Sequence, residues 1–121
     1  MTGVTRVLIC DDAPEARAFV RAVLAGENGY EVVGEASDGA TCLTSIALTH
    51  PDLLVLDLQM PGTDGFYVLD ALRDRPGNPR VLVYSSATDE QVVARVRASG
   101  ADFLAKGAPP EQLAAAVRRL S

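Results

Sequence analysis

Short apolar runs alternate with segments of helical periodicity along the whole chain, and this alternation constrains the fold more than any other feature. The runs with the length and composition of strands are residues 4–10, 30–36, 52–56, 80–85 and 102–105. Between and after them, helical spacing or composition is found at residues 14–24, 40–49, 66–73, 89–99 and 110–120. Strands that alternate with helices through short loops form right-handed βαβ units. The pattern therefore predicts an α/β domain with a parallel sheet and helices on both of its faces.

Composition limits the function classes. The 121 residues suit one domain, which we expect to span residues 1–121 without an output domain. The formal charge of −5, with no cluster of Lys or Arg, argues against direct binding of this chain to nucleic acid or to an anionic membrane. No apolar run approaches the roughly 20 residues of a membrane span, and no signal peptide is visible. Cys10 and Cys42 lack metal-ligand spacing and suit buried thiols of a reducing compartment, so we predict a cytoplasmic protein.

Charged residues follow three of the predicted strands. Asp57 ends the apolar run 52–56, the pair Asp11-Asp12 ends the first run, and Lys106 ends the fifth. Burying a carboxylate costs several kcal/mol unless a partner compensates it, so these acids should lie at an edge and share a partner. In open parallel sheets, ligands bind beyond the carboxyl ends of the strands. We therefore expect the acids and the lysine to converge at one edge.

The residue types of this edge indicate a particular chemistry. Three carboxylates repel one another by about 4 kcal/mol per pair at 4 Å and an effective dielectric constant of 20. A divalent cation that prefers oxygen, such as Mg²⁺, relieves this repulsion. Lys106 adds a positive charge, and Ser85 and Ser86 place hydroxyls at the end of the fourth run. Together these groups are typical of a phosphoryl-transfer site whose nucleophile is a carboxylate.

Four segments, in this order along the chain, resemble the receiver domain of two-component response regulators. They are Asp11-Asp12, the loop 57–65 (Asp-Leu-Gln-Met-Pro-Gly-Thr-Asp-Gly), the strand 81–85 and the segment 100–106 (Gly-Ala-Asp-Phe-Leu-Ala-Lys). The resemblance covers essentially the whole chain. It implies a flavodoxin-like, doubly wound fold: a five-stranded parallel sheet of order 2-1-3-4-5 with five helices on both faces. Residues 32–39 and 106–111 are similar to receivers of the NarL type, which usually precede a DNA-binding domain.

The resemblance also implies a function. The chain would be a phosphorylation-switched signalling domain that takes a phosphoryl group from a sensor histidine kinase or phosphotransfer protein. Its output would be a changed partner-binding surface, which regulates transcription through an attached or separate output. It would not be an enzyme beyond phosphorylating itself from a phosphodonor and slowly losing the group. A homodimer would form through the face of the fourth helix, fifth strand and fifth helix, or through the first and fifth helices.

Residue roles follow from the same resemblance. Asp57 would be the phosphoacceptor, Asp12 a direct Mg²⁺ ligand, Asp11 a ligand through water, the backbone carbonyl of Gln59 a further ligand, Lys106 the partner of a phosphoryl oxygen, Ser85 the switch hydroxyl and Phe103 the switch aromatic. Ser86 competes with Ser85, but the spacing to Gly100-Ala101 favours Ser85.

The segment that ends at Lys106 departs from the family in two ways. It is one residue shorter than in many relatives. Gly107 also stands where relatives commonly have a proline after a cis bond, so we expect no cis peptide here.

Plainer interpretations remain open for single residues. Asp11 or Asp12 could cap the following helix, Lys106 alone could be a surface lysine, and Phe103 could be a core residue. His50, the only histidine, should lie in a loop at the amino end of the sheet, which leaves no candidate phosphohistidine donor.

Two other function classes share parts of this pattern. A Mg²⁺-dependent phosphatase-like enzyme with an Asp nucleophile is the main alternative. The haloacid-dehalogenase type needs an Asp-x-Asp pair, whereas Asp57 is followed by Leu58-Gln59. A flavin- or nucleotide-binding module would need a phosphate loop rich in Gly or Ser/Thr after the first strand, where this chain has Asp-Asp-Ala-Pro.

Overall fold

Five strands and five helices alternate strictly along the chain. A computed structural model describes residues 3–62, 64–73 and 77–121, so Thr63 of the predicted loop lies outside the described residues. The strands are β1 (Thr5–Cys10), β2 (Tyr30–Ala36), β3 (Leu53–Leu56), β4 (Arg80–Ser85) and β5 (Asp102–Ala105). The helices are α1 (Pro14–Ala25), α2 (Gly39–Thr49), α3 (Gly65–Leu72), α4 (Glu90–Ala98) and α5 (Pro110–Arg119). The predicted strand bounds are therefore confirmed to within one residue.

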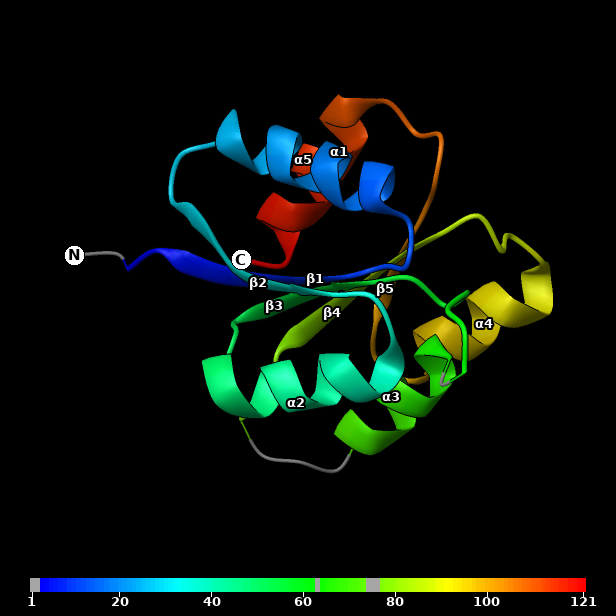
Figure 1. The fold of residues 1–121 in the computed structure, drawn as a ribbon. Helices are drawn as coiled ribbons and strands as arrows, with labels where there is room; N and C mark the ends of the chain where they lie inside the picture. The colour runs from blue at the N-terminus through cyan, green and yellow to red at the C-terminus, as the bar shows by residue number, and fades with distance from the viewer. Residues whose placement is uncertain (1–2, 63, 74–76) are drawn as a thin grey trace.

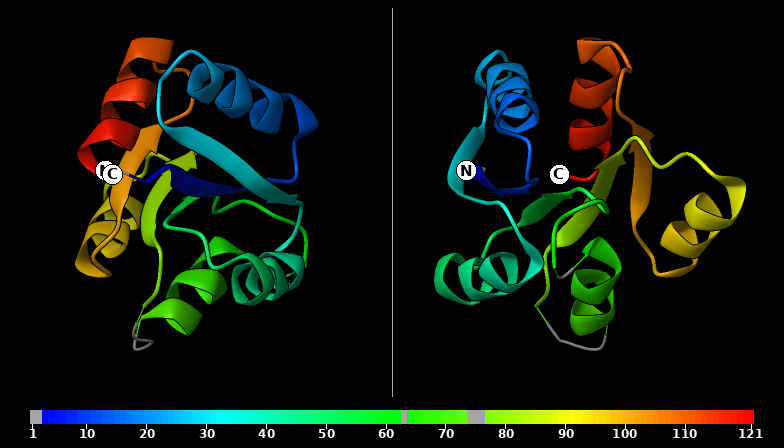
Figure 2. Two further views of the ribbon diagram at one scale, coloured as in Figure 1. Left: turned by 90° about the vertical axis from the view of Figure 1, so that its left-hand side faces the viewer. Right: turned by 45° about the vertical axis from the view of Figure 1, so that its right-hand side comes forward.

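The strands form one parallel sheet of order β2-β1-β3-β4-β5, which confirms the order implied by the resemblance. Helices α1 and α5 cover one face, and α2, α3 and α4 lie on the other (Figures 1 and 2). Among the described residues, no helix has both the length and the apolar character needed to cross a membrane.

The core consists of two layers, one on each side of the sheet. Alternate residues of β1 contribute to different layers, because successive side chains of a strand point to opposite faces. Val7 and Ile9 pack with α1 and α5, whereas Leu8 and Cys10 pack with α2 and α3. All four side chains are buried. Burial on both faces explains why the inner strands are continuous apolar runs rather than alternating ones.

A bulge in β2 changes which face its last residues occupy. Val7 pairs with Val32, but Leu8 pairs with Gly34, so Val33 is an extra residue between them. An extra residue reverses the alternation of side chains beyond it. Glu35, opposite Ile9, consequently lies on the α1 side of the sheet.

Local sequence defines where the helices begin. Asp38, Asp64 and Asp89 are the N-caps of α2, α3 and α4, and each carboxylate accepts a hydrogen bond from a backbone N–H two or three residues later. Asp64, near the end of the loop 57–65, thus defines the start of α3. Helices α1 and α5 instead begin with Pro14 and Pro110, whose fixed φ suits a first turn.

The start of α3 packs directly on the loop that follows β3. The N–H of Gly65 donates to the carbonyl of Leu58 at 3.1 Å. A Cβ atom on Gly65 would lie 2.6 Å from the Asp57 carbonyl oxygen and 2.7 Å from Leu58 Cα. Since both of these are backbone atoms, only glycine allows this approach, which positions the loop after Asp57.

Replacing Gly65 with alanine should therefore destabilise the protein. We expect the free energy of unfolding to fall by about 1–3 kcal/mol, because the helix and the loop must separate to admit the methyl group. The matched control is Gly26→Ala, where the new Cβ would make an ordinary 3.5 Å contact with the Val23 carbonyl oxygen. Urea unfolding followed by circular dichroism measures both variants, and equal free energies for the two would contradict the prediction.

Candidate functional site

Hydrogen bonds extend the sheet one residue beyond the ends of three strands. The N–H of Asp57 donates to the Cys10 carbonyl at 2.9 Å, and the N–H of Asp11 donates to the Ala36 carbonyl at 2.9 Å. After β5, at the same ends of the strands, the N–H of Lys106 donates to the Ser85 carbonyl at 3.0 Å. The residues that follow β1, β3 and β5 therefore emerge at one edge, as predicted from the parallel topology.

The predicted acids are brought together at this edge. Asp11, Asp12 and Asp57 each offer a carboxylate oxygen, and these oxygens lie within 4.8 Å of one another. Asp11 and Asp57 are each only 3% exposed, whereas Asp12 is exposed. Three converging carboxylate oxygens, one of them open to solvent, match the hard-oxygen preference of Mg²⁺.

Lys106 links the two buried acids. Its Nζ lies 2.8 Å from Asp11 Oδ2 and 3.3 Å from Asp57 Oδ2. Burial raises the pKa of Asp11, although the hydrogen bonds from Lys106 and from the Ala13 N–H oppose this shift. Burial alone would lower the pKa of Lys106, but the two carboxylates outweigh it and raise that pKa. A charged lysine therefore lies between two acids. We call the group formed by Asp11, Asp12, Asp57 and Lys106 the acidic edge.

Each oxygen of the Asp57 carboxylate has its own donor. The Gln59 N–H donates to Oδ1 at 3.2 Å, and Lys106 Nζ donates to Oδ2. The carboxylate is thus oriented by its own loop and by the residue that follows β5.

Neither Asp11 nor Asp12 is the N-cap of α1. The N-cap of α1 is Ala13, and no side chain caps this helix. Asp11 Oδ1 instead accepts from the Ala13 N–H at 2.9 Å, which closes the turn between β1 and α1. The interpretation of Asp11 or Asp12 as the N-cap of the following helix is therefore wrong.

The two serines at the end of β4 have different surroundings, as strand alternation predicts. Ser85 is fully buried, and its Oγ accepts from the Ala87 N–H at 3.2 Å. Ser86 is exposed and donates to Gln59 Oε1 at 2.7 Å. Among the described residues, neither hydroxyl forms a hydrogen bond with the acidic cluster.

Phe103 and the loop after Lys106 complete this side of the molecule. Phe103 pairs with Val83 in the sheet and is half-buried against the core layer of α2, α3 and α4. Gly107 has φ of +95°, a conformation that the proline of many relatives cannot adopt. The described part of the chain contains no cis peptide bond, which confirms the expectation for this loop.

The remaining residues singled out in the sequence lie away from this edge or beneath it. His50 is exposed at the end of α2, near the amino end of β3, as predicted. Cys10 and Cys42 are both buried free thiols. A hydrogen bond with Cys42 and burial raise the pKa of the Cys10 thiol, so it stays protonated.

Comparison with known proteins identifies this arrangement. The family model for the response regulator receiver domain matches residues 7–118. This chain belongs to that family. The structure aligns at a TM-score of 0.90 and 35% identity with the signal receiver domain of a NarL response regulator from Mycobacterium tuberculosis, covering 98% of this chain and 96% of that chain.

Curated relatives place the receiver within longer proteins. The nitrate/nitrite response regulator NarL of Escherichia coli is 36% identical over 114 residues, which cover 93% of this chain and 53% of that protein. A protein-glutamate methylesterase/protein-glutamine glutaminase of Myxococcus xanthus is 46% identical over 103 residues, covering 84% of this chain and 30% of that protein. The chain thus spans about half of the length of the first of these relatives and less than a third of the second. The resemblance to receivers of the NarL type is confirmed.

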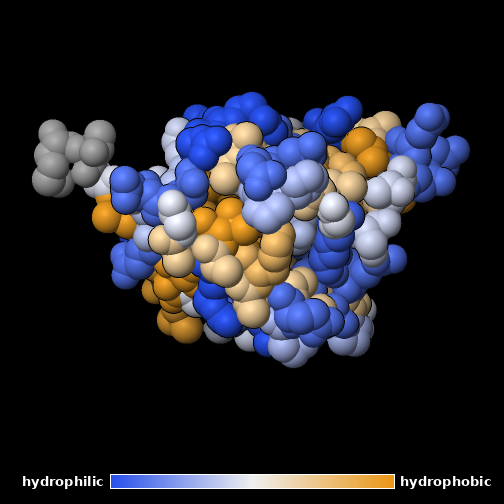
Figure 3. Space-filling view, turned by 90° about the horizontal axis from the view of Figure 1, so that it is seen from above, coloured by the Kyte–Doolittle hydropathy of each residue, from blue (hydrophilic) through white to orange (hydrophobic). Residues whose placement is uncertain are grey.

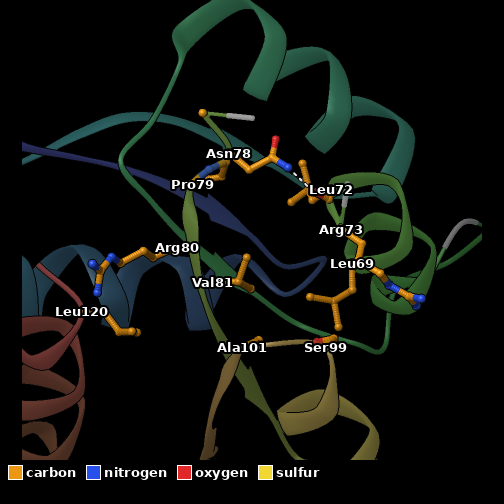
Figure 4. Close-up of a pocket in the computed structure, with 12 residues that line it drawn as sticks. Leu69, Leu72, Arg73, Asn78, Pro79, Arg80, Val81, Ser99, Ala101 and Leu120 are labelled. Atoms are coloured by element: carbon orange, nitrogen blue, oxygen red, sulfur yellow. Dashed lines mark hydrogen bonds between the residues drawn. The ribbon is translucent and has the colours of Figure 1, made fainter. Parts of the chain in front are cut away.

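A pocket lies at the opposite edge of this receiver's sheet. It has a volume of about 520 Å³ and is lined by residues such as Leu69, Arg73, Asn78, Arg80 and Leu120 (Figure 4). None of the three acids of the cluster contributes to it. The pocket is therefore separate from the three acids.

One contact of the acidic edge was missed in the sequence. Arg17 Nη1 donates to the carbonyl oxygen of Asp11 at 2.6 Å, and its Nε donates to Glu35 Oε1 at 2.9 Å. The available signals were two arginines at i and i+4 in α1, Arg17 and Arg21, and an acid in the predominantly apolar run 30–36.

Removal of the Lys106 ammonium should destabilise the metal-free receiver. In Lys106→Met, two buried carboxylates lose their cation, and we expect the free energy of unfolding at neutral pH to fall by about 2–4 kcal/mol. The loss should shrink as the pH falls toward about 4, because Asp11 then takes up a proton more readily in the folded than in the unfolded chain. Urea unfolding in the presence of a chelator measures this, with Lys106→Arg as the control that keeps the charge. Equal stability of the Met and Arg variants would contradict it.

Proposed function

We propose that Asp57 accepts a phosphoryl group from the phosphohistidine of a sensor histidine kinase or phosphotransfer protein. The observation that supports this assignment most directly is the position of Asp57. It is a buried carboxylate at the carboxyl edge of the sheet, it contacts Lys106, and its oxygens lie among those of two further acids. The family membership of the chain supports the same reaction class.

The transfer conserves atoms and charge in a simple way. A carboxylate oxygen of Asp57 forms a bond to phosphorus while the phosphorus–nitrogen bond of the donor breaks. The electron pair of that bond stays on the imidazole, and the product on this chain is an acyl phosphate. Since such transfers depend mainly on positioning and charge stabilisation, the residues around Asp57 supply the catalysis.

Residues of the acidic edge divide this work. The ammonium group of Lys106 would bind a phosphoryl oxygen. Asp12 and Asp57 would hold Mg²⁺ directly, Asp11 would hold it through water, and the Gln59 carbonyl would be a further ligand. When bound, Mg²⁺ offsets the charge of the acids and of the phosphoryl group. The cluster of carboxylate oxygens supports this assignment.

Ser85 and Phe103 are our candidates for the switch that reports phosphorylation. Ser85 ends β4 beside the Asp57 edge, and Phe103 lies on the neighbouring strand against the α4 side of the core. Movement of the Ser85 hydroxyl toward the phosphoryl group would open space for the Phe103 ring. Coupling free energies of about 1–3 kcal/mol are typical for such switches.

Phosphorylation itself tests the acceptor. Incubation of the chain with acetyl phosphate and Mg²⁺ should add the mass of one phosphoryl group, seen by intact-mass spectrometry, and Asp57→Asn should show no gain. The matched control is Asp64→Asn, because asparagine also caps helices and Asp64 lies outside the cluster. A mass gain of one phosphoryl group in Asp57→Asn, or no mass gain in the wild type, would contradict the assignment of Asp57 as the acceptor.

Mg²⁺ should stabilise the folded receiver if it binds where we propose. A concentration 100 times the dissociation constant adds about 2.7 kcal/mol to the free energy of unfolding. Asp12→Asn removes a proposed direct ligand that is exposed, so it should abolish most of this gain without harming the fold. Urea unfolding with Mg²⁺ or with a chelator measures the gain in each variant. An undiminished gain in Asp12→Asn would exclude Asp12 as a direct ligand.

The wider setting follows from the relatives. We propose that the chain acts in the cytoplasm and regulates transcription through an attached or separate output, and that the chain itself has no activity beyond gaining and losing its phosphoryl group. The absence of a second acid at Gln59 speaks against the phosphatase alternative.

Dimerisation is proposed for either of two faces, the one formed by α4, β5 and α5 or the one formed by α1 and α5. Half-buried Phe19, Val23 and Leu120 belong to the core layer on the α1 and α5 side. Apolar residues also gather among hydrophilic ones on that side of the surface (Figure 3). The sedimentation coefficient of the phosphorylated chain, compared with that of the unphosphorylated chain, tests whether a dimer forms.

A further inference from the structure

A side chain of α1 reaches back to the backbone between the two acids of the first loop. Arg17 Nη1 lies 2.6 Å from the Asp11 carbonyl oxygen. This carbonyl belongs to the planar peptide group that joins Asp11 to Asp12, so fixing it restricts the orientation of that whole group. The N–H of Asp11 is held separately, by the Ala36 carbonyl at 2.9 Å. Two hydrogen bonds from different elements thus hold the backbone that carries both acids.

Arg17 is itself held in place by Glu35. Its Nε donates to Glu35 Oε1 at 2.9 Å, and Arg21 donates to the other oxygen of the same carboxylate. The Arg17 side chain is 19% exposed, so this contact is largely sheltered from water. One guanidinium therefore joins a helix, a strand and the loop between β1 and α1. A lysine could not make both contacts in this fixed geometry.

The bulge in β2 makes this arrangement possible. If β2 paired with β1 regularly, without the bulge at Val33, Glu35 would pair with Cys10 and face the α2 side of the sheet, away from Arg17. Bulges commonly redirect a side chain in this way. The segment 32–36 is part of the sequence that resembles NarL-type receivers, and the function proposed above left its acid without a role.

We propose that Arg17, held by Glu35, is a positioning residue that sets the relative orientation of Asp11 and Asp12 for Mg²⁺ binding. The proposal rests on the proposed function of the acidic edge and adds a role for two residues outside it. Arg17 contacts the backbone carbonyl of Asp11 and the carboxylate of Glu35, so it would act through the backbone rather than as a ligand.

A charge effect and a positioning role predict opposite changes in Mg²⁺ affinity when Arg17 is replaced by an uncharged residue. A cation beside a divalent metal site repels the metal, so removal of the guanidinium would strengthen Mg²⁺ binding. Loss of orientation would weaken it, since partners that orient metal ligands typically contribute 10- to 100-fold in affinity. The direction of the change therefore distinguishes a positioning role from a simple charge effect.

The experiment measures Mg²⁺ affinity directly, by titration calorimetry on the unphosphorylated chain. We expect Arg17→Gln to weaken Mg²⁺ binding about tenfold, and Arg17→Lys and Glu35→Gln to weaken it as well. Arg21→Gln is the matched control, because Arg21 also binds Glu35 but does not contact Asp11; its affinity should stay within about twofold of the wild type. In a double variant, Glu35→Gln should add little to the loss already caused by Arg17→Gln.

Phosphorylation supplies the second readout. With acetyl phosphate, the Mg²⁺ concentration for half-maximal rate should rise about tenfold in Arg17→Gln, while the rate at saturating Mg²⁺ stays near the wild-type rate. Unchanged or tighter Mg²⁺ binding in both Arg17→Gln and Glu35→Gln would overturn the positioning role. Should Arg17→Gln fail to fold, as judged by circular dichroism, Arg17→Lys and Glu35→Gln decide the question. A wild-type chain that neither binds Mg²⁺ nor gains a phosphoryl group would instead refute the proposed function.

Discussion

The repulsion among three carboxylates at one edge of the sheet is the constraint on which the functional half of the molecule depends. Asp11 and Asp57 are buried, and a metal-free cluster of this kind favours separation of its acids. Lys106 opposes that tendency by contacting both buried acids at once. The price is a raised pKa at Asp11, where burial prevails over the lysine. The site is thus held in a compact but strained electrostatic balance that a divalent cation would relieve.

The fold maintains this balance through backbone contacts. The hydrogen bonds of Asp11, Asp57 and Lys106 continue the sheet beyond its strands, so the backbone of each residue is fixed by a neighbouring strand. Gly65 then lets α3 approach the loop after Asp57, and Gly107 turns the chain after Lys106. Sheet ends and glycines together give the acids little freedom to move apart.

Much of this could be predicted from the sequence, for a physical reason in each case. Strands buried on both faces must be apolar throughout, so the run 52–56 is visible without a structure, and a charge directly after it, Asp57, is conspicuous. The contacts of Arg17 could not be predicted, because they depend on which face Glu35 occupies. That face is decided by one extra residue in β2, and strand pairing register cannot be deduced from an apolar run with a glycine in it. The pairing of Lys106 with Asp11 likewise depends on side-chain geometry across three strands.

The two cations of the site restrain the acids in different ways. Lys106 is a point charge on a flexible stem, and it binds the carboxylates themselves, so its contacts can be exchanged when another charged group arrives. Arg17 binds a backbone carbonyl through a planar group that Glu35 already holds, so its contact does not compete with any ligand of the acids. In the function we propose, the site alternates between two charge states, so it needs both kinds of restraint. Lys106 would follow the charge, and Arg17 would preserve the backbone geometry at Asp11.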